Sequence, residues 1–118
     1  MGLECKLSTR MAVVLITDYS LLIIDYSFSM AKHIKLTGRV QGVFFRKATQ
    51  EKAYELHVTG WVKNTDDDSV EIFAQGDETN LNKFIEWCKQ GPPRARVQDI
   101  QITDEENDDR LTRFSIVY

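Results

Sequence analysis

The sequence is poor in the residues that build covalent or metal-based frameworks. Its 118 residues include two cysteines, Cys5 and Cys88, and two histidines, His33 and His57. Two cysteines are too few for a disulfide framework, and the four side chains are not spaced as metal ligands. We therefore expect a reduced protein in a reducing compartment, the cytoplasm, with no bound metal and no cofactor.

Positive charge is also in short supply. Fifteen Lys and Arg residues face eighteen Asp and Glu residues, which gives a formal net charge of -3. This balance argues against general binding of nucleic acid or of an anionic membrane surface. The charges are unevenly placed, however, because residues 31–50 hold five basic residues and no acid, whereas acids gather at 66–68 and 104–109. A small anion would be steered toward the basic segment.

Long apolar runs are missing as well. No run reaches the roughly 18 apolar residues that indicate a membrane span. Asp18 and Asp25 interrupt the apolar stretches near the N-terminus, and no Ala-x-Ala-like cleavage site follows them. A regular pattern begins at Met30. We expect residues 1–29 to be an N-terminal extension outside the fold, with a targeting role as the alternative, and residues 30–118 to form one domain.

The hydrophobic periodicity of the remaining chain predicts seven elements. Strands are expected at residues 33–40, 58–65, 69–75, 96–103 and 112–118, and helices at 45–56 and 78–90. The order of strand, helix, strand, strand, helix and strand, with one extra strand, predicts the α+β class. We expect a ferredoxin-like α/β sandwich, with an antiparallel-rich sheet and both helices on one face. Such a fold serves enzymes, RNA binders and regulatory modules alike.

Two potentially reactive side chains are predicted to be inert. Cys88 belongs to the apolar stripe of the second helix, which Asp77 is expected to cap, and nothing in the sequence supplies the base or cation that a reactive thiolate needs. His33 lies on the polar face of the first strand, so we expect it to be exposed to solvent rather than to be a ligand.

The stretch from Gly38 to Arg46, Gly-Arg-Val-Gln-Gly-Val-Phe-Phe-Arg, has the features of an anion site. Two glycines four residues apart end the first strand, and a helix begins at once. Such a turn can point several backbone N–H groups at one spot, where the helix N-terminus adds partial positive charge and Arg46 adds a planar fork of donors. A lone arginine is more often a solvated surface residue, but the glycine turn favours anion binding.

Two motifs resemble those of the acylphosphatase family. Residues 38–46 match a Gly-x-Val-Gln-Gly-Val-x-Phe-Arg loop, and residues 60–64 match Gly-Trp/Tyr-x-x-Asn, with similarity from about His33 to Tyr118. The resemblance implies hydrolysis of the carboxyl–phosphate bond of an acyl phosphate to a carboxylate and inorganic phosphate. It departs at residues 66–68, three aspartates where many relatives turn through glycine, so we expect that turn to be strained or of another type.

The resemblance also assigns roles to individual residues. Arg46 would bind the phosphate and Asn64 would orient the attacking water. The backbone of the loop would form the phosphate cradle, at Gln41, Gly42, Val43, Phe44 and Phe45. The expected partners are the acyl phosphate and inorganic phosphate alone, bound by a monomer with no nucleic-acid or membrane partner.

The chemistry of the reaction agrees with this modest set of groups. The departing carboxylate has a conjugate acid with a pKa of about 4, so it leaves without a proton. Phosphoryl transfer depends on positioning and charge stabilisation rather than on a strong nucleophile. Two other functions stay open. An RNA-binding module would need an aromatic strand motif that is missing here, whereas a non-catalytic anion-binding regulatory module differs only in having no use for Asn64.

Overall fold

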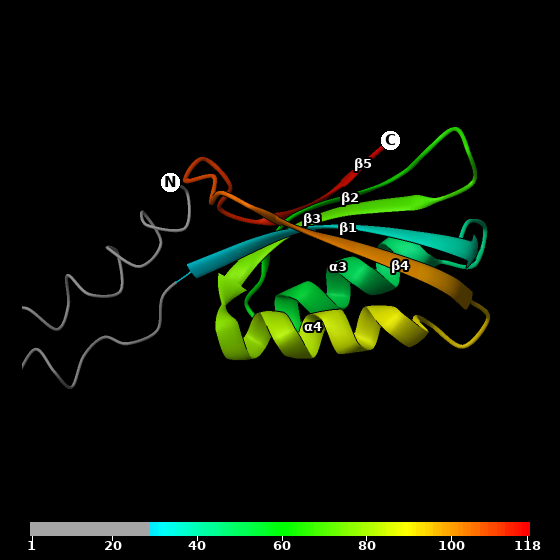
Figure 1. Cartoon of the computed structure of the whole chain (residues 1–118), viewed down its shortest axis with the longest axis horizontal. Helices are drawn as coiled ribbons and strands as arrows, with labels where there is room; N and C mark the ends of the chain where they lie inside the picture. Colours follow the sequence, from blue (N-terminus) through cyan, green and yellow to red (C-terminus); the bar gives the residue numbers. More distant parts are fainter. Residues whose placement is uncertain (1–28) are drawn as a thin grey trace, which may run out of the picture.

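In the computed structural model, which describes residues 29–118, a five-stranded sheet carries both helices on one face (Figure 1). The N-terminal extension was predicted for residues 1–29; residues 1–28 lie outside the described residues, and Ser29 is the first residue of the first strand. The strands are β1 (Ser29–Arg39), β2 (Thr59–Asn64), β3 (Val70–Asp77), β4 (Arg96–Glu105) and β5 (Phe114–Val117). The helices are α3 (Phe45–Glu55) and α4 (Glu78–Gln90). The ferredoxin-like α+β sandwich is confirmed.

The order and direction of the strands bring three chain segments to the same end of the sheet. The order is β4-β1-β3-β2-β5. β1 and β2 both run antiparallel to β3, and β5 runs parallel to β2. The C-terminal ends of β1, β2 and β5 therefore lie at the same end of the sheet. The chain leaves β1 there and enters α3.

The core between the sheet and the helices follows the predicted periodicity. β1 contributes Ile34 and Leu36, both fully buried, and β3 contributes Val70, Ile72 and Ala74. The stripe of α4 is buried as predicted, at Leu81, Phe84, Ile85 and Cys88. Burial raises the pKa of the Cys88 thiol, which keeps it protonated and confirms its structural role.

The expected cap of α4 is also confirmed. The Asp77 carboxylate accepts a hydrogen bond from the Asn80 backbone N–H at 2.7 Å. Glu78 adds an acid in the first turn, where the helix dipole favours negative charge. The N-terminus of α4 is thus satisfied from within the chain.

The boundary of β4 differs from the prediction. β4 runs to Glu105, whereas the sequence pattern assigned Asp104 and Glu105 to an acidic loop. The reason is a cross-strand charge pair: Asp104 lies opposite Lys32 of β1 in the register, and the Lys32 Nζ binds its carboxylate. Pairs of opposite charge directly across two strands stabilise a sheet, so polar residues extend this edge strand.

The C-terminus of α3 ends in a turn that usually contains glycine. The Val58 N–H donates to the Ala53 carbonyl at 2.8 Å, and the His57 N–H donates to the Tyr54 carbonyl at 3.3 Å. This pair of bonds defines a Schellman motif, and His57 occupies its left-handed position with φ 58°.

We expect His57→Gly to raise the free energy of unfolding by about 1 kcal/mol, because glycine adopts the left-handed conformation without steric strain. Chemical denaturation with urea measures the change. His57→Ala is the control, since it removes the exposed imidazole but keeps the strain. Equal stability of the glycine and alanine variants would contradict the strain argument.

Candidate active site

One cavity of about 290 Å³ lies where β1, β2 and β5 end. Its volume is close to the lower end of the range of about 300–1,000 Å³ that small-molecule sites occupy. Within the described part of the chain, two of the side chains that line it are cationic and none is acidic. The lining residues are Val40, Gly42, Phe44, Phe45, Arg46, Lys47, Asn64, Ile116 and Tyr118. The cavity therefore suits a small anion.

The loop between β1 and α3 has a backbone that few residues adopt. Gly42 has φ 73° and Phe44, the N-cap of α3, has φ 63°. A Cβ on Gly42 would meet no atom within 4 Å, so the left-handed conformation and not the available space favours glycine there. The two left-handed residues curl the loop around the first turn of α3.

The N-terminus of α3 is uncapped, unlike that of α4. Among the described residues no side chain caps it, and its first turn contains no acid. The first N–H groups of a helix have no partner within the helix and carry partial positive charge. This end of α3 is therefore available to an external anion.

Arg46 lies in that first turn and lines the cavity. Its guanidinium carbon is 4.9 Å from the centroid of the Tyr118 ring. Within residues 29–118, no carboxylate forms an ion pair with it. The planar donors of Arg46 thus remain available for bidentate contact with a phosphate.

Asn64, at the end of β2, lines the same cavity and has an unsatisfied acceptor. Its Oδ1 atom is buried and accepts no hydrogen bond from any described residue. A buried polar atom without a partner costs about 1–3 kcal/mol, so few survive in native structures without a reason. A carboxamide oxygen in this position can accept a hydrogen bond from a water molecule in the cavity.

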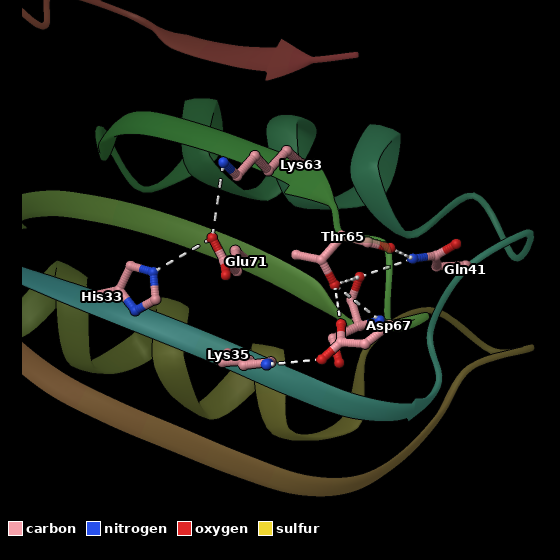
Figure 2. A network of polar contacts seen from close by, with 8 residues as sticks. His33, Lys35, Gln41, Lys63, Thr65, Asp67 and Glu71 are labelled. Atoms are coloured by element: carbon pink, nitrogen blue, oxygen red, sulfur yellow. Dashed lines mark hydrogen bonds and ion pairs between the residues drawn. The ribbon is translucent and has the colours of Figure 1, made fainter.

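The side chain of Gln41 joins the loop to the β2–β3 hairpin (Figure 2). Its Nε2 donates to the carbonyl oxygens of Thr65 and Ser69, both at 2.9 Å. Thr65 follows Asn64 directly, so these two bonds fix the end of β2 relative to the loop. The family resemblance assigned Gln41 to the backbone cradle and gave its side chain no role. The only hint in the sequence was that Gln41, with a long amide side chain, follows directly after a predicted strand. Which groups that side chain binds depends on the order of the strands in the sheet.

The hairpin is also held from the side of β1. The Asp67 carboxylate accepts a hydrogen bond from the Thr65 hydroxyl and pairs with the Lys35 ammonium group at 2.9 Å (Figure 2). The Asp68 N–H donates to the Thr65 carbonyl at 3.3 Å, and Asp68 itself is left-handed with φ 66°. The turn is therefore strained at its last aspartate, as the departure from the family pattern suggested.

These contacts favour the charged form of the Asp67 carboxyl group. The hydrogen bond from Thr65, followed by that from Lys35, holds the pKa of Asp67 well below its ordinary value of 3.8. A lowered pKa in the folded state adds stability that is fully present above the unfolded-state value and is lost as the pH falls through the folded-state value.

We therefore expect Asp67→Asn to lower the free energy of unfolding at neutral pH and to lower it less as the pH falls below 3.8. Urea denaturation at about pH 7 and at about pH 3 measures the difference. Asp66→Asn changes a neighbouring exposed aspartate of the same turn and is the matched control. A difference for Asp67→Asn that is as large in acid as at neutral pH would rule out this linkage.

The structure brings together most of the residues that the sequence selected. Five of the seven line the cavity: Arg46, Asn64, Gly42, Phe44 and Phe45. The side chains of the other two turn elsewhere, since Val43 is buried in the core and Gln41 reaches the hairpin. Tyr118, at the chain end beyond β5, was not selected, because nothing in the sequence shows that β5 runs parallel to β2.

A larger cavity of about 670 Å³ lies between the two helices and the segment after α4. Glu51 and Glu55 line it together with Lys52. Two carboxylates beside one ammonium group would repel a phosphate, so size does not make this cavity the better anion site.

Two further structural facts bear on the sequence predictions. Residues 29–118 contain no cluster of three or more His, Cys, Asp or Glu side chains placed to hold a metal ion. Neither helix in the described part of the chain is long and apolar enough to cross a membrane.

Comparisons with known proteins agree on one family. The sequence profile of the family described as Acylphosphatase matches residues 32–116. An acylphosphatase of Shewanella amazonensis is 46% identical over 83 residues, which cover 70% of this chain and 91% of that protein. One of Syntrophobacter fumaroxidans is 40% identical over 86 residues, which cover 73% and 89%. The crystal structure of the Bacillus subtilis acylphosphatase superposes with a TM-score of 0.72 at 45% identity, covering 75% of this chain and 99% of the other.

Proposed function

Because the chain belongs to the acylphosphatase family and is a hydrolase of acyl phosphates, we propose that it carries out this reaction in the cavity formed by Arg46 and Asn64. The products are a carboxylate and inorganic phosphate. The single observation that carries the placement is the position of Asn64, which lines the same cavity as Arg46 and whose buried Oδ1 has no hydrogen-bond partner among the described residues.

In this proposal the phosphate group sits at the N-terminus of α3. Arg46 holds two of its oxygens in a bidentate contact, in which each charge-assisted hydrogen bond contributes about 1.5–3 kcal/mol. The backbone N–H groups of the loop supply the other donors, as a preorganised nest. The nest is assigned to Gln41, Gly42, Val43, Phe44 and Phe45.

Asn64 then places the attacking water. Its Oδ1 accepts a hydrogen bond from the water and directs a lone pair of the water oxygen at phosphorus, opposite the bond to the carboxylate. The P–O bond to the acyl group breaks as the bond to the water oxygen forms. The carboxylate leaves without protonation, so no general acid is required.

The side chain of Gln41 acts through Asn64. Because it binds the carbonyl oxygens of Thr65 and Ser69, it keeps the carboxamide of Asn64 at a fixed distance from the phosphate loop. A misplacement of about 1 Å can lower a rate by about 100-fold, which is why such a positioning contact matters.

We further propose that the protein acts as a monomer on small molecules in the cytoplasm. One chain supplies all nine lining residues of the cavity. An RNA-binding role has little support, because Lys35 and Lys63 on the open face of the sheet pair with Asp67 and Glu71, which leaves little net charge for a polyanion.

A direct assay tests the proposed function. Purified protein is mixed with acetyl phosphate or benzoyl phosphate in the presence of EDTA, and the release of inorganic phosphate is followed. We expect turnover that EDTA does not reduce. Binding of inorganic phosphate without turnover of either substrate would instead favour the non-catalytic regulatory module.

A further inference from the structure

The mouth of the cavity exposes two large aromatic side chains. Phe44 is 75% exposed and Tyr118 is 94% exposed, and both line the cavity. They come from segments far apart in the sequence, the loop before α3 and the chain end after β5. The sheet topology brings them to the same cavity, because β1 and β5 end at the same end of the sheet.

Phe44 occupies its place at a double disadvantage. A left-handed conformation, here with φ 63°, is a genuine outlier for a bulky residue. The ring is also left in water instead of being buried in the core. Backbone outliers of this kind cluster at ligand-binding sites, where the surrounding structure maintains them.

The cavity is divided into a charged part and an apolar part. Arg46 and Lys47 provide the only charged side chains that line it within the described chain, and both belong to the first turn of α3. Ile116, which is only partly buried, adds aliphatic surface. The Tyr118 ring lies 4.9 Å from the guanidinium carbon of Arg46, so an aromatic surface begins directly beside the group assigned to the phosphate.

An acyl phosphate has the same division, a dianionic phosphate joined to an acyl group through one oxygen atom. With the phosphate at the N-terminus of α3, the acyl group must extend toward the mouth. We propose that Phe44 and Tyr118 form the acyl-binding part of the site and select substrates with an aromatic acyl group over those with a short aliphatic one. This inference rests on the proposed function.

The test compares benzoyl phosphate with acetyl phosphate. The quantity measured is the ratio of kcat/KM for the two substrates, in which any general loss of loop geometry cancels. Phe44→Asn removes the ring but keeps a residue that tolerates the left-handed conformation. Tyr118→Ser removes the other ring, which is 94% exposed and so contributes nothing to the core. We expect each variant to lower the ratio by about tenfold, which is the scale of one aromatic contact.

Tyr54→Ser is the matched control, because Tyr54 is a 55% exposed aromatic residue of α3 outside the cavity. Its ratio should equal that of the wild type. Turnover of both substrates with an unchanged ratio in Phe44→Asn and Tyr118→Ser would overturn this inference and leave the proposed function intact. If the wild-type protein hydrolysed neither substrate, the proposed function would fail and this inference with it.

Discussion

Replacing Arg46 with alanine should lower kcat/KM for an acyl phosphate by about 10³-fold or more and leave the protein folded. Arginines that contact a transferring phosphoryl group contribute about 10³–10⁵ to the rate. Arg46 is placed for that contact, because it shares the cavity with the uncapped end of α3 and pairs with no described carboxylate. Steady-state kinetics measure the loss, and circular dichroism verifies the fold.

Two variants separate the role of Arg46 from a general effect of charge. Arg46→Lys keeps the charge but loses the planar fork, so we expect it to recover only a small part of the activity. Arg39→Ala removes an exposed arginine that does not line the cavity, and its activity should be close to that of the wild type. An Arg46→Ala enzyme with near wild-type kcat/KM would exclude Arg46 from the phosphate site.

Replacing Asn64 with alanine should separate binding from turnover. We expect kcat to fall by about 10²–10³-fold, the loss that follows removal of one preorganised hydrogen-bonding group from an active site. Inorganic phosphate should still inhibit with an unchanged inhibition constant, because Arg46 and the loop hold it. Kinetics with inorganic phosphate as a product inhibitor provide both numbers.

The same substitution should not lower stability. The Oδ1 of Asn64 accepts no hydrogen bond from a described residue, so its removal breaks no contact within the described chain. Urea denaturation should therefore show an Asn64→Ala protein at least as stable as the wild type. Asn82→Ala, which changes an exposed asparagine of α4, is the control.

If phosphate inhibition disappeared while turnover survived in the Asn64→Ala protein, the roles assigned to Arg46 and Asn64 would have to be exchanged.

Patterns within single segments were predictable from the sequence. The alternation around Ile34 and Leu36, the stripe that contains Cys88 and the cap at Asp77 each depend on neighbours a few residues away. The glycine turn before Arg46 belongs to this group as well. Local periodicity and local hydrogen bonding determine these features, so a single segment contains the necessary information.

Contacts between distant segments were not predictable. The extension of β4 depends on Lys32 meeting Asp104 across two strands, and the contact of Tyr118 with Arg46 depends on β5 running parallel to β2. The two hydrogen bonds of the Gln41 side chain depend on the β2–β3 hairpin lying beside the loop. Each of these follows from the strand order, which periodicity does not specify.

With the phosphate held by the loop and the water held by Asn64, the proposed reaction is attack of water on phosphorus. Hydrolysis of an acyl phosphate in ¹⁸O-labelled water, with mass spectrometry of both products, tests this most directly. We predict that the label enters inorganic phosphate and that the carboxylate remains unlabelled. Label in the carboxylate would mean that water attacks the carbonyl carbon, and it would exclude the roles proposed for the loop and Asn64.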